Sequence, residues 1–384
     1  MALTRRGALE LLGSFGSGAL MPALSGVPAL AQQRDFKIGV VASMTGPVSP
    51  FFKEYVDGFR AYVVDWNKRG GAIGRQVVLE VLDDESGAVQ AANSYRRLAG
   101  DADTTLAWVA GTSIGGLAIK AIASELKLPV VSGGALDALG RPADPYFFKI
   151  APANSDYLKL YFTWVKKRNF KRVAMLLSND SYGQGEAQTA KELVGPLGLE
   201  IVALETFATT DTNFSSQLVR IRATQPDILY VGATGAPAIL IYKQIRQFDL
   251  KYPLTMMLAG LTDAFFRAID GAPNADGVTT PGLLGMLGSN AQGSSGALYS
   301  KLAAALGRPA SLGNALGWDI GIVSEAAIAG SDGSRAGIRD ALDRVSDLPG
   351  IDGPITFKPT DHIGQDPRGM AVLQLSGGKF KYAE

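Results

Sequence analysis

Residues 40–59 read VVASMTGPVSPFFKEYVDGF, and they pass from a buried strand through a polar turn into a helix. From Phe52 onward, apolar side chains recur at helical spacing, so one stripe of this helix can be covered by a sheet. Phe51 lies outside that stripe. It either packs against a neighbouring loop or forms a wall of a ligand site at the carboxyl end of the strand, where open α/β sheets bind their ligands.

The same strand-to-helix pattern continues along most of the chain. This alternation predicts an α/β fold whose parallel sheets are wound by helices. The predicted strands are FKIGVV, VVLEVL, LAWVAG, LPVVSG, RVAMLL, EIVALETF, DILYVG and LTMMLA. The predicted helices span residues 53–69, 89–100, 116–126, 155–168, 185–193, 213–224 and 237–248.

The N-terminus predicts a secretory signal peptide over residues 1–31. Arg5-Arg6 is followed by a weakly apolar run that is rich in glycine and serine, and Ala29-Leu30-Ala31 ends it. The arginine pair favours the twin-arginine export route, with Sec export as the alternative. A membrane anchor is disfavoured, because a spanning helix needs about 20 mostly apolar residues.

Charge and composition limit the function of the exported chain. The whole chain has 37 basic and 36 acidic residues, and removing residues 1–31 takes away Arg5, Arg6 and Glu10, so the remainder is formally neutral. It therefore has no basic field for nucleic acid or an anionic membrane. With no cysteine, it has no disulfide and no site for lipid modification, which predicts a freely soluble periplasmic protein.

Residues typical of catalysis are scarce. Nucleophilic catalysis usually needs a base beside the nucleophile, but the chain has no cysteine and a single histidine, His362, in a polar turn-rich segment. The pair Asp83-Asp84 matches no metal-ligand spacing. The G-x-G of SYGQGEA is too short a motif to indicate a phosphate site. We therefore predict a protein that is not an enzyme and has no cofactor and no metal, with a secreted hydrolase as the least favoured alternative.

The order of several motifs resembles that of the periplasmic leucine/isoleucine/valine-binding proteins, the solute receptors of branched-chain amino acid ABC importers. The resemblance extends over nearly all of residues 36–384. The matching stretches are KIGVVASMTGPVS, DWNKRGGAIGRQVVLEVLDDES, VAGTSIGGLA, LPVVSGGA, FFKIAPANSDY, VAMLLSNDSYGQG, DTNFSSQLVRIRATQPDILYVG and ADGVTT.

This resemblance implies a type I binding protein, in which two doubly wound parallel-sheet lobes are joined by a three-crossover hinge and close on a ligand. Broken stretches at YFFKIAPANSDY, at residues 274–295 and at LPGIDGPITF mark the expected crossings. We expect an N-terminal lobe of residues 34–152 plus about 283–355. The C-terminal lobe is expected to contain residues 153–282 plus about 356–384. The implied partners are a small-molecule ligand and an inner-membrane ABC permease, and the chain is expected to be a monomer.

The resemblance also implies a set of ligand-binding positions. In the first lobe the wall aromatic matches Phe51. The serine that holds a ligand carboxylate matches Ile114 or Gly115, where the hydroxyl is missing although Ser113 is adjacent. The loop after the fourth strand matches Gly134, Ala135 and Leu136, and a second hydroxyl is lost there. In the second lobe, Tyr182 is retained, the next tyrosine matches Thr234, and the acidic partner of the ligand's ammonium falls near Gly260, with Asp263 as the nearest carboxylate.

These departures affect the expected ligand. Backbone N–H groups at the helix starts after Gly115 and Leu136 can still hold a carboxylate. An ammonium without a paired charge is costly to bury. We therefore expect a small hydrophobic carboxylate, an aromatic acid before a branched-chain amino acid, unless Asp263 takes the ammonium. An amide or urea sensor on the same fold is the alternative.

Overall fold

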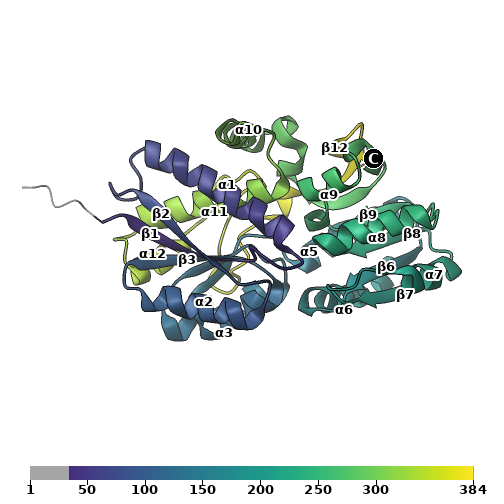
Figure 1. Ribbon diagram of the computed structural model, residues 1–384, viewed down its shortest axis with the longest axis horizontal. Helices are drawn as coiled ribbons and strands as arrows, with labels where there is room; N and C mark the ends of the chain where they lie inside the picture. The colour runs from purple at the N-terminus through teal and green to yellow at the C-terminus, as the bar shows by residue number, and fades with distance from the viewer. Residues whose placement is uncertain (1–33, 384) are drawn as a thin grey trace, which may run out of the picture. The chain divides into compact units, whose positions relative to one another are not determined.

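The computed structural model describes residues 34–383, and the signal peptide predicted over residues 1–31 lies outside them. Within the described residues the chain forms two β-sheets, each flanked by helices (Figure 1). None of the described helices is long and apolar enough to span a membrane. The predicted class, two wound α/β lobes, is confirmed.

The first sheet has five parallel strands in the order β2-β1-β3-β4-β5. Its central strands are apolar on both faces, as expected when helices cover both sides of a parallel sheet. In β1, Val40 packs with α1 whereas Val41 packs with α2 and α3, because successive side chains point to opposite faces. The strands are β1 (Phe36–Ala42), β2 (Val77–Asp83), β3 (Thr104–Ala110), β4 (Val130–Ser132) and β5 (Phe147–Lys149).

Helices from two distant parts of the sequence cover this sheet. α1 and α11 lie side by side on one face, and α2 and α3 lie on the other (Figure 1). The helices are α1 (Ser49–Lys68), α2 (Ala88–Gly100), α3 (Ser113–Leu126), α4 (Asp137–Gly140), α10 (Ser294–Leu306), α11 (Leu312–Ala329) and α12 (Arg335–Leu342).

The second sheet has seven strands in the order β12-β11-β10-β9-β8-β6-β7. Strands β6 to β10 are parallel, whereas β11 and β12 are antiparallel additions at one edge. The strands are β6 (Arg172–Ser178), β7 (Glu200–Phe207), β8 (Ile228–Gly232), β9 (Leu254–Met256), β10 (Thr279–Leu283), β11 (Met370–Ser376) and β12 (Lys379–Tyr382).

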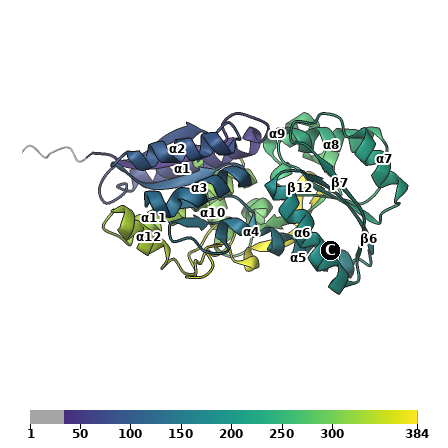
Figure 2. The ribbon, with the colours of Figure 1, turned by 90° about the horizontal axis from the view of Figure 1, so that it is seen from below.

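The helices of the second sheet also form two layers. α5 and α6 pack on one face, and α7 and α8 pack on the other (Figure 2). The α-helices are α5 (Asn154–Lys167), α6 (Ser181–Leu197), α7 (Ser215–Ala223), α8 (Ala236–Gln247) and α9 (Asp263–Ala268). The short 3₁₀ helices are η1 (Leu258–Gly260), η2 (Ala272–Ala275), η3 (Leu284–Asn290) and η4 (Pro367–Gly369).

Two of the predicted helices begin four residues earlier than the sequence indicates. α1 begins at Ser49 and not at residue 53, so Phe51 and Phe52 lie in its first turn. α6 begins at Ser181 and not at residue 185, because Asp180 accepts a hydrogen bond from the Gly183 N–H and caps the helix. In both helices, residues that were predicted to lie in the preceding loop therefore form the first helical turn.

The chain passes between the two sheets three times: after β5, after β10 and before β11. Buried carboxyl groups tie the second and third crossings together. Asp319 on α11 accepts hydrogen bonds from the N–H groups of Ile351 at 2.7 Å and Asp352 at 3.0 Å. The carboxyl of Asp352 in turn accepts from the Gly285 N–H at 3.1 Å. Burial raises the pKa of Asp319 to about 7 and raises that of Asp352 well above its usual range.

α1 and α11 approach each other unusually closely, because glycines lie at their contact. A Cβ added to Gly58 would lie 2.1 Å from the carbonyl oxygen of Asn314, and one added to Gly317 would lie 2.0 Å from that of Tyr55. Neither contact can be relieved without moving helix backbone. The glycines therefore set the position of α1, and with it the position of Phe51.

We predict that Gly317→Ala lowers the free energy of unfolding by about 2 to 4 kcal/mol, because the added methyl group overlaps a backbone oxygen. Urea denaturation measures the change. The matched control is Gly100→Ala at the end of α2, where nothing lies within 4 Å of the added Cβ. Equal stability of the two variants would contradict the close packing of α1 on α11.

Candidate functional site

A cavity of about 90 Å³ lies between loops that follow strands of both sheets. β1, β3 and β4 contribute from the first sheet, and β6, β8 and β9 from the second. Parallel strands end at the same edge of a sheet, which brings these loops together. The lining residues are Val48, Phe51, Phe52, Tyr55, Gly111, Thr112, Ser113, Gly133, Gly134, Ala135, Ala151, Tyr157, Ser178, Asp180, Tyr182, Phe207, Thr209, Gly232, Thr234, Pro237, Met257, Leu258, Ala259 and Leu316.

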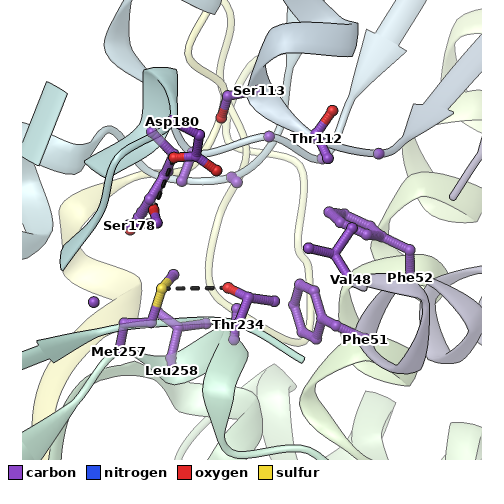
Figure 3. A pocket seen from close by; sticks show the side chains of 18 of the residues that line it. Val48, Phe51, Phe52, Thr112, Ser113, Ser178, Asp180, Thr234, Met257 and Leu258 are labelled. Atoms are coloured by element: carbon purple, nitrogen blue, oxygen red, sulfur yellow. Dashed lines mark hydrogen bonds between the residues drawn. The ribbon is translucent and has the colours of Figure 1, made fainter. Parts of the chain in front are cut away.

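An aromatic cluster at the start of α1 forms one wall of the cavity. The ring centroid of Phe51 lies 5.4 Å from that of Phe52 and 5.0 Å from that of Tyr55, both in edge-to-face arrangement. The Tyr55 hydroxyl donates to the carbonyl oxygen of Gly133 at 3.2 Å, which links this wall to the loop after β4. The open space of the cavity is bordered by Phe51, Val48, Thr234 and Met257 (Figure 3). Phe51 therefore packs on its neighbours and lines the cavity at once.

The start of α3 supplies polar groups from the first lobe. Thr112 caps this helix by accepting a hydrogen bond from the Gly115 N–H at 3.2 Å. The N–H groups of Ser113 and Ile114 belong to the first helical turn and have no intrahelical acceptor. No hydrogen bond from the Ser113 hydroxyl to another described residue is present. Because a helix N-terminus carries partial positive charge, this side of the cavity favours an anionic group.

The second lobe supplies a carboxylate and hydroxyl groups. Asp180 accepts hydrogen bonds from the Ser178 hydroxyl at 2.8 Å and from the Gly183 N–H at 3.0 Å (Figure 3). The Thr234 hydroxyl donates to the sulfur of Met257 at 3.4 Å. Among the described lining residues Asp180 is the only charged side chain, since no lysine or arginine reaches the cavity. The remaining surface is mostly apolar.

A buried acid lies behind the wall of the second lobe. Glu186 on α6 accepts hydrogen bonds at Oε1 from the hydroxyls of Tyr182, at 3.0 Å, and Tyr230, at 2.6 Å. Burial raises the pKa of Glu186 to about 7, although the two tyrosine hydroxyls partly oppose this rise. Tyr182 lies between Glu186 and the cavity, so the acid contacts a residue that lines the site.

Six of the predicted site residues meet at this cavity, and the other five lie elsewhere. Ile114 points outward and is 46% exposed. Gly115 faces α2, where an added Cβ would contact Ala91, and Leu136 packs against Gly185 of α6. The six lining residues are Phe51, Ser113, Gly134, Ala135, Tyr182 and Thr234.

The expected acidic position is also displaced from the cavity. Gly260 ends the turn η1, and its Cα faces the carbonyl oxygen of Ala233. Asp263 begins α9, where its N–H donates to Glu54 at 3.1 Å and its carboxylate pairs with Arg308 at 3.4 Å. The interpretation of Asp263 as an ammonium partner is therefore not supported, because this carboxylate is already engaged outside the cavity.

Several lining residues were not predicted from the sequence. Asp180 was visible only as a polar residue before SYGQG, and Glu186 lies four residues after Tyr182, which is the helical spacing that brings two side chains together. Ser178 follows the predicted strand RVAMLL, which was the signal that could have identified it, whereas Met257 and Leu258 fall inside the predicted strand LTMMLA because β9 ends earlier, at Met256. Phe207 ends the predicted strand EIVALETF and Thr209 follows it, so the end of a strand was the signal for these two as well.

Comparisons with known proteins agree with this geometry. A family model described as periplasmic binding protein matches residues 35–379. A Leu/Ile/Val-binding protein of Rhizobium johnstonii is 27% identical over 241 residues, covering 61% of this chain and 64% of that protein. The chain thus matches less than two thirds of the length of this relative.

Two solved structures share the fold. A branched-chain amino acid transporter substrate binding protein of Streptococcus pneumoniae, in complex with isoleucine, has a TM-score of 0.82 at 22% identity, covering 91% of this chain and 99% of that chain. A solute binding protein of an ABC transporter from Rhodopseudomonas palustris, in complex with benzoate, has a TM-score of 0.80 at 22% identity, covering 91% and 95%.

We predict that the free energy of unfolding falls as the pH rises from 5 to 7, in part because of Glu186. Its pKa is about 7 in the folded chain and about 4.5 when exposed, so over this range the unfolded chain loses a proton that the folded chain keeps. Glu186→Gln should remove about 2 to 3 kcal/mol of the decline, measured by urea denaturation at both pH values. Glu192→Gln, on the exposed face of α6, is the control, and an unchanged pH dependence in Glu186→Gln would refute the prediction.

Proposed function

Because the chain belongs to the periplasmic binding protein family, we propose that it is the solute-binding protein of an ABC importer and captures a small hydrophobic carboxylate. The observation that carries this proposal is the cavity itself. Loops from both sheets line it, as expected when two lobes close on a ligand. Its volume of about 90 Å³ suits a small molecule and not a peptide chain.

The lining supports both parts of the proposed ligand. Phe51, Phe52 and Met257 offer apolar surface for a hydrocarbon side chain or a ring. The first turn of α3, with Ser113, offers N–H and hydroxyl donors for a carboxylate. The solved relatives with isoleucine and with benzoate are both complexes of small hydrophobic carboxylates, which is consistent with a ligand of this class.

The proposal includes the setting of the protein. Export by the signal peptide over residues 1–31 would deliver a monomer to the periplasm, where it would pass its ligand to an inner-membrane permease. The three crossings between the sheets would act as the hinge, with the N-terminal lobe made of residues 34–152 and about 283–355. The remaining residues, 153–282 and about 356–384, would form the other lobe.

Enzymatic hydrolysis is the less favoured function. The single histidine, His362, lies outside the cavity and stacks on Phe148 at a centroid distance of 4.1 Å. Its Nδ1 lies 3.0 Å from the carbonyl oxygen of Phe147, and its Nε2 lies 3.2 Å from Asp343. A histidine held in this way is not placed to activate Ser113 or Ser178 as a nucleophile.

A thermal-shift screen of the refolded mature chain tests the proposed function. The panel contains leucine, valine, phenylalanine, benzoate, straight-chain acids and the uncharged amides acetamide and urea. We expect hydrophobic carboxylates to raise the melting temperature, since a ligand at 100 times its Kd adds about 2.7 kcal/mol to stability. Stabilisation by the amides alone would replace this proposal with an amide receptor, and no stabilisation by any carboxylate would overturn it.

We predict that Phe51→Ala weakens binding of the stabilising carboxylate about 10- to 100-fold, because the ligand loses an aromatic wall and the burial that it provides. Isothermal titration calorimetry measures the Kd. Val64→Ala, at an exposed position of the same helix, is the matched control and should leave the Kd unchanged. Asp263→Asn should change the Kd no more than about twofold, since this carboxylate does not reach the cavity. A Kd that is insensitive to Phe51→Ala would place the ligand elsewhere.

A further inference from the structure

Two hydrogen bonds near the start of α1 join the first lobe to the second lobe. The carboxyl of Glu54 on α1 accepts from the Asp263 N–H on α9 at 3.1 Å. The carbonyl oxygen of Pro47, in the loop before α1, accepts from the Ala236 N–H at the start of α8 at 3.3 Å. None of these four residues lines the cavity, although Phe51, which lies between the two acceptors in the sequence, does.

The donors and the acceptors of these bonds are fixed to different sheets. α8 and α9 pack together over the second sheet, where the rings of Tyr242 and Phe265 lie 5.2 Å apart. α1 packs on the first sheet, where Phe59 meets Trp108 of β3 edge to face at 5.1 Å. Both bonds must therefore break when the lobes move apart at this end of the cavity.

A glycine permits the contact at Pro47. Gly235 precedes α8 with a φ of 66° and a ψ of −136°, and a Cβ added there would lie 2.2 Å from the carbonyl oxygen of Pro47. Gly293 precedes α10 in nearly the same conformation, with a φ of 66° and a ψ of −141°, but nothing lies within 4 Å of its added Cβ. The backbone favours glycine at both positions. Only Gly235 also leaves room for the other lobe.

Glu54 lies in a buried setting that the two lobes complete together. Its side chain is 8% exposed, and the charged groups that face it among the described residues are Asp263 and Arg308. Tyr299 on α10 lies beside that charged pair. Burial raises the pKa of Glu54 to about 7, whereas the Ser311 hydroxyl and the Asp263 N–H partly oppose this rise. The ion pair of Arg308 with the Asp263 side chain is partly exposed and contributes little.

We propose that the contacts of Glu54 with the Asp263 N–H and of Pro47 with Ala236 form a latch that holds the lobes closed, and that a proton on Glu54 strengthens it. The inference rests on the function proposed above and adds to it a contact, outside the cavity, that sets ligand affinity. When the lobes close, Glu54 takes a proton from the solvent and enters the interface uncharged. When they separate, its side chain meets water and returns the proton.

Proton uptake on closing gives the latch a defined pH dependence. The pKa of Glu54 is about 7 in the closed form and about 4.5 when the side chain is exposed. The closed form therefore binds the proton more tightly, and its advantage is complete below about pH 4.5 and is lost as the pH rises through 7. Because a ligand gains affinity when the closed form is favoured, we expect affinity to fall about 10-fold between pH 5.5 and 7.5.

The distance between the lobes tests the latch without knowledge of the ligand. The chain has no cysteine, so Val89→Cys on α2 and Val219→Cys on α7 provide two exposed sites for spin labels. Double electron–electron resonance on the refolded mature chain should show more of the distance given by the structure at pH 5.5 than at pH 7.5, alone or with benzoate or L-leucine. Circular dichroism establishes that the labelled chain is folded.

Glu54→Gln separates the proton from the contact. The amide oxygen of glutamine still accepts an N–H, but the side chain has no charge at any of these pH values. This variant should favour the closed distance equally at pH 5.5 and 7.5, and at pH 7.5 it should close at least as fully as the parent chain. Glu192→Gln, exposed on α6, should keep the pH dependence of the parent chain.

The two glycines test the contact at Pro47. Gly235→Ala should reduce the closed population and weaken the binding of benzoate or L-leucine about 10-fold by calorimetry, because the methyl group meets Pro47 when the lobes close. Gly293→Ala has the same backbone strain without that contact, and should keep the closed population and the Kd of the parent chain. Melting curves establish that both variants are folded.

The outcomes separate the latch from the proposed function. If the closed population is equal at pH 5.5 and 7.5, if Glu54→Gln keeps the pH dependence, or if Gly235→Ala behaves as Gly293→Ala does, the latch is wrong and the proposed function stands. If the lobes respond to pH and to these variants as expected but no carboxylate binds, the proposed function alone is wrong.

Discussion

The direction of the strands is the constraint on which the rest of the structure depends. Because β1, β3 and β4 run parallel, the loops that follow them leave the first sheet at one edge, and β6, β8 and β9 do the same in the second sheet. Residues that are far apart in the sequence meet there without any dedicated contact to bring them together. The lining of the cavity thus follows from the topology, and its chemistry follows from the residue types that occupy the strand ends.

The position of the aromatic wall depends on helix packing as well as on strand direction. Phe51 lies in the first turn of α1, and α1 is held by glycines that bring its backbone into contact with α11. α11 comes from residues 312–329, so the position of one wall depends on a part of the chain that does not itself follow a strand of the first sheet. Small residues at helix contacts are commonly explained by packing alone. Here the packing also sets how far an aromatic ring extends into the cavity.

Buried ionisable groups are concentrated where the two lobes meet. Lys149 at the first crossing donates to the carbonyl oxygens of Ala135 and Pro152, and burial lowers its pKa to about 7. Asp319 and Asp352 link the other two crossings, and Glu186 lies behind the cavity wall. Such groups are a poor source of stability, because each loses its hydration. The hydrogen bonds of Lys149, Asp319 and Asp352 to backbone groups instead specify which strands and turns lie together.

Local pattern was sufficient for the fold class and for most of the strands. Eight strands and seven helices were predicted from apolar periodicity and turn residues, since a buried strand or a helix stripe is recorded in adjacent residues. The strands β10, β11 and β12 were not predicted, and neither were the helices α4, α9, α10, α11 and α12. Pro281 and Gly282 weaken the strand pattern of β10, and β11 and β12 form a hairpin closed by Gly377-Gly378 that only the edge of an existing sheet stabilises.

The sequence by itself determined the class of the protein and its two-lobed architecture, because these depend on motif order and on the alternation of strands and helices. It did not determine which carboxyl lines the cavity. Asp263 was the nearest acid along the chain, but α9 turns it towards Arg308, whereas Asp180, which caps α6, lines the cavity. Such a neighbourhood depends on the packing of α6 against β8, and residues that are distant in sequence acquire it only when the sheet forms.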